Sequence, residues 1–65
     1  MNKKQQLATK IIQRIRYIQN DARWQNILDY LSLESKATFE QVRHEIRVLS
    51  FFELHETNNF LEKIK

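Results

Sequence analysis

The apolar residues of this chain fall into stripes with the three- and four-residue steps of an α-helix. The first stripe occupies one helical face and consists of Leu7, Ala8, Ile11, Ile15, Ile18 and Ala22. The second consists of Trp24, Ile27, Leu28 and Leu31. On one continuous helix the two stripes would be displaced by roughly 200°, so a single straight helix cannot bury both. We therefore predict a break near Asn20-Asp21, where the Asp21 carboxylate can accept the free N–H groups of a second helix as its N-cap.

Two capping boxes predict two further helices. Thr38 is followed three residues later by Gln41, and Ser50 is followed three residues later by Glu53. Each cap is worth about 1 kcal/mol of stability. Between the second stripe and Thr38, residues 32–37 show no periodicity and predict a loop. The positions expected to face inward are Phe39, Val42, Ile46 and Leu49 in the third helix, and Phe51, Leu54, Leu61 and Ile64 in the last.

The last fifteen residues also allow a β-hairpin. Residues 51–56 and 60–65 could pair around Thr57-Asn58-Asn59, which would place Glu53 opposite Lys63. The turn lacks the Asn-Gly or Asp-Gly pair that two-residue hairpins prefer, so a helix is favoured and the hairpin remains the alternative for residues 51–65.

Composition supports a helical architecture. The 65 residues include no glycine, no proline and no cysteine, so the chain has few tools for tight turns and cannot form a disulfide. We predict one all-α domain over residues 1–65, a compact bundle of three or four short helices with Trp24, Phe39 and the isoleucines of the first helix inside. The absence of cysteine, of a long apolar run and of an apolar segment behind the first residues favours a cytoplasmic protein without a membrane span.

The sequence offers little for catalysis. His44 and His55 are eleven residues apart across a predicted helix boundary, so they do not share the helical face that a metal site would need. A phosphate-binding glycine loop is impossible without glycine. The carboxylates are interleaved with basic residues and are typical of surface pairs such as Glu40 with Arg43 or His44. We therefore expect no enzyme activity, no catalytic residues, no metal, no cofactor and no small-molecule substrate.

Charge is distributed unevenly along the chain. Residues 1–23 contain six Lys and Arg and one Asp, a net charge of +5, whereas the remainder contains five Lys and Arg and seven acidic residues, a net charge of −2. On the first helix, Lys3, Lys10 and Arg14 share one flank with Tyr17 beside them, a combination that could contact phosphates and base edges of DNA. The alternative is a solvated basic face that keeps the protein soluble.

The two capped helices also require comparison with helix-turn-helix proteins. No glycine is present for the tight turn, and the face that would enter the DNA groove includes Glu53 and Glu56, which phosphates repel. The sequences ILDYL at residues 27–31 and ATFEQV at residues 37–42 resemble the opening of winged-helix repressors. The chain departs from that pattern where a recognition helix should follow, so we transfer no function from this resemblance.

Several apolar residues lie outside their stripes or at the edges of them. Phe51, Phe52 and Phe60 are the candidate protein interface, and Val48, Ile12 and Tyr30 also fall outside or at an edge. Such residues can instead complete a wide helical core. We predict a small non-catalytic regulator or adaptor that binds protein, as a homodimer or with a larger partner. The alternative is a basic nucleic-acid-binding protein, such as a transcription, plasmid or phage regulator, that contacts DNA through the first helix. A first helix lying on an anionic membrane ranks last, because its apolar face is aliphatic and lacks Trp or Phe.

Overall fold

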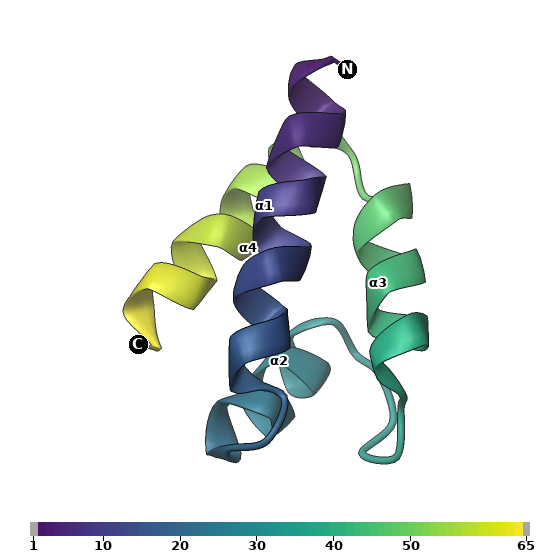
Figure 1. Cartoon of the computed structure of the whole chain (residues 1–65), viewed down its shortest axis with the longest axis vertical. Helices are drawn as coiled ribbons and strands as arrows, with labels where there is room; N and C mark the ends of the chain where they lie inside the picture. The colour runs from purple at the N-terminus through teal and green to yellow at the C-terminus, as the bar shows by residue number, and fades with distance from the viewer. Residues whose placement is uncertain (1, 65) are drawn as a thin grey trace.

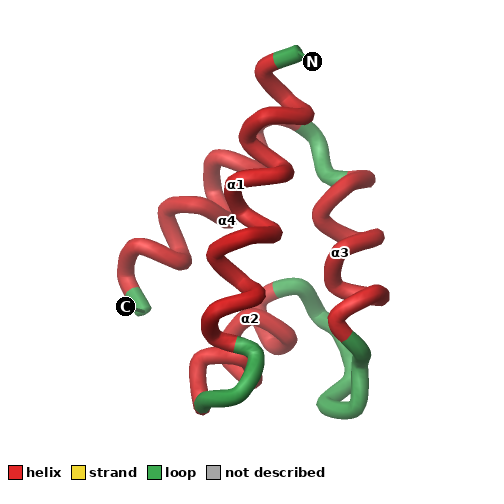
Figure 2. The backbone as a smooth tube through the Cα atoms, in the orientation of Figure 1, coloured by secondary structure: helices red, strands yellow, loops and turns green. Residues whose placement is uncertain are grey.

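The computed structural model describes residues 2–64, which form four helices (Figure 1). These are α1 (Lys3–Ile18), α2 (Ala22–Tyr30), α3 (Phe39–Val48) and α4 (Phe51–Lys63). Within the described range there is no strand, as Figure 2 shows. The predicted all-α bundle is therefore confirmed. The hairpin alternative is wrong, because α4 runs without interruption through Thr57, Asn58 and Asn59.

Helix α1 is the centre of the bundle. It packs against each of the other three helices. In Figure 1, α1 runs along the long axis with α3 on one side and α4 on the other, while α2 crosses behind its C-terminal end. A helix with three neighbours needs a wide apolar face, and the buried arc of α1 from Ile18 to Ile12 is about 120°. This explains why Ile12, which lies outside the predicted stripe, is buried.

The core consists of aliphatic side chains from all four helices. Its buried members are Ala8, Ile11, Ile12, Ile15, Ile18, Ile27, Leu28, Val42, Ile46, Leu54 and Leu61. The prediction that Trp24 and Phe39 lie inside is only partly correct. Both rings are half-buried and pack against the edge of the core, with their centroids 6.5 Å apart.

The buried face of α4 includes a polar residue between the predicted inward positions Leu54 and Leu61. Thr57 is 1% exposed, and its hydroxyl donates a hydrogen bond of 2.9 Å to the backbone carbonyl of Glu53. Leu54, Thr57 and Leu61 therefore form a regular inward stripe. Phe51, which was predicted to face inward, is instead 44% exposed, because the stripe through Thr57 turns the first residue of α4 toward solvent.

The predicted helix starts are confirmed by their capping contacts. The Asp21 carboxylate accepts the backbone N–H of Arg23 at 2.8 Å. Both predicted capping boxes are present: the Thr38 hydroxyl accepts the N–H of Gln41, and the Ser50 hydroxyl accepts that of Glu53. The side chain and backbone of Arg23 hold the pKa of Asp21 below its usual value, and the backbone N–H of Ser50 does the same to the pKa of Glu53.

Helix α2 ends in a left-handed turn without glycine. Ser32 has φ of 59°, and it is the one non-glycine residue with positive φ in the described part of the chain. The N–H of Ser32 donates to the carbonyl of Asp29, and the N–H of Leu33 donates to that of Leu28. These two bonds form a Schellman motif, in which the left-handed position is normally a glycine. This turn lets the loop that was predicted over residues 32–37 leave α2 sharply.

The left-handed turn gives a first prediction. We expect Ser32→Gly to raise the free energy of unfolding by about 0.5–1 kcal/mol, because glycine adopts this φ without the steric cost that serine bears. Urea unfolding followed by circular dichroism measures the change. Ser35→Gly in the same loop is the matched control and should destabilise by a similar amount, since Ser35 has no positive φ to relieve. A Ser32→Gly variant that loses as much stability as the control would contradict the prediction.

Candidate interaction surfaces

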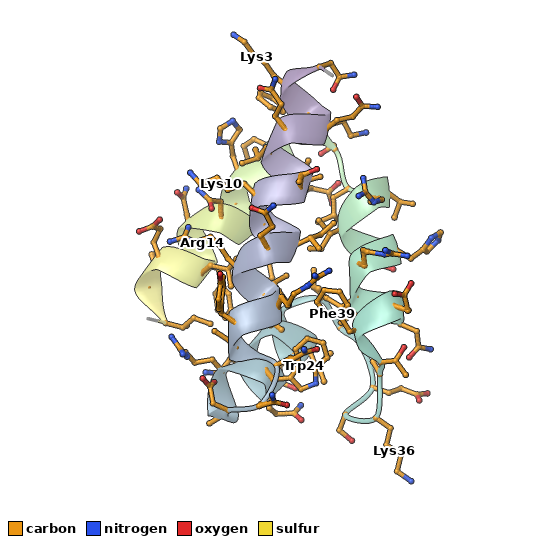
Figure 3. The ribbon with its side chains drawn as sticks, in the orientation of Figure 1. Lys3, Lys10, Arg14, Trp24, Lys36 and Phe39 are labelled. Carbon is orange, nitrogen blue, oxygen red and sulfur yellow. The ribbon has the colours of Figure 1, made fainter. Side chains whose placement is uncertain are left out.

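The candidate basic flank of α1 is largely open to solvent. Lys3 and Lys10 are exposed, and Tyr17 is 88% exposed. Figure 3 shows Lys3, Lys10 and Arg14 on the side of α1 that faces α4, with Lys3 projecting away from the bundle at the N-terminal end. Lys3, Lys10 and Tyr17 recur every seven residues and so lie along one line of the helix.

Arg14 differs from the other members of this flank. Its Nη1 donates to Oδ1 of Asn58 at 2.9 Å and lies 2.7 Å from Oε1 of Glu62. The side chain is half-buried between α1 and α4 and links the two helices. This contact also accounts for the polar Asn58, which interrupts the apolar stripe expected for α4. A phosphate would have to compete with Glu62 for Arg14, so the exposed cations of this flank are Lys3 and Lys10.

Three exposed apolar side chains gather where α3 turns into α4. Val48 is 59% exposed, Phe51 44% and Phe52 71%. We call these three residues the α3–α4 corner. Ser50 and Glu53 beside them satisfy each other in the capping box, with the Ser50 N–H donating to Oε1 of Glu53 at 2.9 Å. Burial of the corner against a partner therefore leaves neither of these capping groups without a hydrogen bond.

Phe60 does not belong to the corner. It is half-buried and stacks on Tyr30 of α2, with ring centroids 4.4 Å apart. Asn26, Asp29 and Ile64 line a shallow hollow beside this pair. The candidate interface of Phe51, Phe52 and Phe60 is thus divided between two surfaces, because Phe60 faces α2 while Phe52 faces solvent.

The packing of α3 against α1 assembles a second cationic surface that the sequence analysis did not identify. Lys4 and Arg47 both line a hollow between the two helices. Further along α1, the guanidinium carbon of Arg16 lies 5.3 Å from the ring centroid of Phe39. Trp24 stacks on the same ring, and Figure 3 shows Trp24 and Phe39 directed toward one another. Both contacts depend on the packing of α3 beside α1, so no sequence signal could have identified them.

The described residues offer no obvious chemical centre. His44 and His55 are exposed on different helices, and the ring of His55 packs edge-on against Phe51 at 4.6 Å. Over residues 2–64, no group of three or more His, Cys, Asp or Glu side chains is placed to hold a metal ion. None of the four described helices is both long and apolar enough to cross a bilayer.

Comparisons with known proteins find no match to the chain among protein-family models, curated proteins or solved structures. The interpretation of its surfaces therefore depends on their own chemistry.

Proposed function

We propose that the protein is a non-catalytic regulator or adaptor that acts by binding protein, and that a second copy of the chain binds at the α3–α4 corner. The observation that carries this proposal is the 71% exposure of Phe52, with Val48 and Phe51 exposed within the same short stretch of chain. Clustered exposed apolar side chains on a small protein mark interaction sites more often than isolated ones do. Aromatic residues are also enriched among those that dominate binding energy.

The size of the surface is compatible with this proposal. A stable interface buries about 800 Å² on each partner, which is about a sixth of the 4579 Å² accessible surface of this chain. The three corner residues can supply the apolar centre, and the polar residues around them the rim. Dimer formation would also add buried apolar area to a domain whose own core is small.

The rim of the corner favours a second copy as the partner. His44 lies one turn before Val48 on α3, and Glu56 lies one turn after Phe52 on α4. Both are exposed, and neither forms an ion pair within residues 2–64. A two-fold axis that passes between α3 and α4 at the corner, perpendicular to the line joining them, places α3 of one copy opposite α4 of the other. In this arrangement each imidazole N–H lies toward a carboxylate of the other copy. The same surface is then complementary to itself.

The substitution that tests this proposal is Phe52→Asp. We expect the wild-type chain to sediment at twice its 8.0 kDa mass, and the variant to sediment at 8.0 kDa, because a buried aspartate without a partner opposes association. Sedimentation equilibrium over a concentration series measures both masses. Since Phe52 is largely exposed, the variant should keep the circular dichroism of the wild type.

Tyr17→Asp is the matched control, because it places the same charge at another exposed aromatic residue, on α1. This control should remain a dimer. A wild-type chain that stays at 8.0 kDa across the series, or a control that dissociates as readily as Phe52→Asp, would contradict the proposed dimer.

A further inference from the structure

The groove between α1 and α3 is lined by cationic and polar side chains from both helices. Asn2, Lys4 and Gln5 of the N-terminal end of α1 face Arg47 near the C-terminal end of α3. Figure 1 shows these two helices side by side along much of their length. Lys4 and Arg47 are exposed, and neither has an acidic partner in the range 2–64.

Arg16 is a third cation at the contact between α1 and α3, where it reaches Phe39 of α3 near the other end of α1. It lies twelve residues after Lys4, a rise of about 18 Å along the helix. Its guanidinium sits over the ring of Phe39, the first residue of α3, and this cation–π contact orients the group without using its N–H donors. We use the name α1–α3 groove for the surface that carries Lys4, Arg16 and Arg47.

The acidic residues of α3 leave these three charges uncompensated. Glu40 pairs with Arg43, one turn before Arg47. Glu45 lies on the opposite flank of the helix, roughly 160° around the axis from Arg47. The other ion pairs among the described residues join Arg14 to Glu62 and Arg23 to Asp21, both outside the groove.

We propose that the α1–α3 groove binds the phosphate backbone of nucleic acid. Spaced, unpaired cations along an extended groove match a polymer that carries regularly repeated negative charges. Arginine adds donors that suit phosphate oxygens, and Gln5 adds a neutral amide. The side chains that form the groove include no exposed large apolar residue to enter a bilayer, which favours nucleic acid over a lipid surface. The contacts reach phosphates rather than bases, so binding is independent of sequence.

The test compares three double variants that each remove two positive charges. Arg16→Gln with Arg47→Gln removes two of the three cations of the groove. Lys3→Gln with Lys10→Gln removes the two exposed positive charges on the flank of α1 that faces α4. The third pair, Lys36→Gln with Lys63→Gln, changes exposed lysines elsewhere, in the loop before α3 and at the end of α4. Binding is measured by the fluorescence anisotropy of a short labelled DNA duplex of random sequence at about 50 and 200 mM salt. Circular dichroism checks that each variant keeps its helices.

We expect the wild type to bind at the lower salt and to lose most of its affinity at the higher salt. The groove variant should bind about tenfold more weakly, and its slope of log affinity against log salt should fall by about 2. The two comparison variants should lose only the few-fold that a lower net charge explains.

Four results would overturn the proposal. The first is an absence of wild-type binding at low salt, and the second is an equal loss in all three variants. The third is binding to phosphatidylglycerol vesicles without binding to DNA. A loss confined to the Lys3 and Lys10 variant would also overturn it, because the contact would then lie on the flank of α1 that faces α4. The readout is DNA affinity, so the outcome is independent of whether the α3–α4 corner forms a dimer.

Discussion

Ile11→Ala should destabilise the protein by about 2–5 kcal/mol, the cost of replacing a fully buried aliphatic side chain and leaving a cavity. Ile11 is 0% exposed and lies on the buried face of α1, the helix that contacts all the others. A domain of this size has about 3–10 kcal/mol of total stability. We therefore expect the variant to lose a large part of its stability, and urea unfolding followed by circular dichroism measures the loss.

A graded series makes this prediction specific. Ile11→Val removes one methylene and should cost about 0.5–1.5 kcal/mol. Ile64→Ala is the matched control, because it truncates the same side chain at a half-buried position near the end of α4, and it should cost less than Ile11→Ala. If Ile11→Ala and Ile64→Ala cost the same, α1 would not be the centre of the core.

The sequence was sufficient for the helices because their signals are local. A capping box involves two residues only three positions apart. The angular displacement between the first two apolar stripes requires a helix break, whichever helices pack against those stripes. The starts at Asp21, Thr38 and Ser50 were predicted for this reason, and each is confirmed by a side-chain contact to the first turn. The cap formed by Asn2 and Gln5 at the start of α1 was missed, although the same type of residue pair is present in the sequence.

The sequence was less informative about faces, because burial depends on how many neighbours a helix has. Ile12 is buried since α1 has helices on both sides, which no periodicity in α1 alone reveals. Thr57 can occupy a core position because its hydroxyl donates a hydrogen bond to the backbone of its own helix. This polar residue interrupts the apolar pattern of the sequence, but it still belongs to the buried face of α4. Because Leu54, Thr57 and Leu61 form the inward stripe of α4, Phe51 lies at the surface.

The candidate surfaces were only partly predictable for the same reason. Lys3 and Lys10 were predicted from one helix and are exposed on it. Arg14 belongs to the same flank, but it donates a hydrogen bond to Asn58, which lies 44 residues later in the chain. The groove cations come together only when α3 docks on α1. Surfaces that one helix carries can be identified from its sequence, whereas surfaces shared by two helices need the tertiary structure.

Trp24→Ala should cost about 2 kcal/mol, less than the 3–5 kcal/mol expected for a fully buried tryptophan. Trp24 is half-buried and packs on Phe39 and on the edge of the core, so truncation removes part of its apolar contact area and the aromatic stack. Urea unfolding followed by circular dichroism measures the change, since the substitution removes the only tryptophan of the chain and with it the fluorescence signal.

Trp24→Phe is the control for this stack, because it keeps an aromatic ring against Phe39 and should recover most of the lost stability. A loss of 4 kcal/mol or more in Trp24→Ala, on the scale of fully buried tryptophans, would place the ring in the core. An alanine variant as stable as the wild type would show that the stack contributes nothing. The ring of Phe39 also contacts the guanidinium of Arg16. Trp24→Ala should therefore weaken that cation–π contact and lower the DNA affinity proposed for the α1–α3 groove.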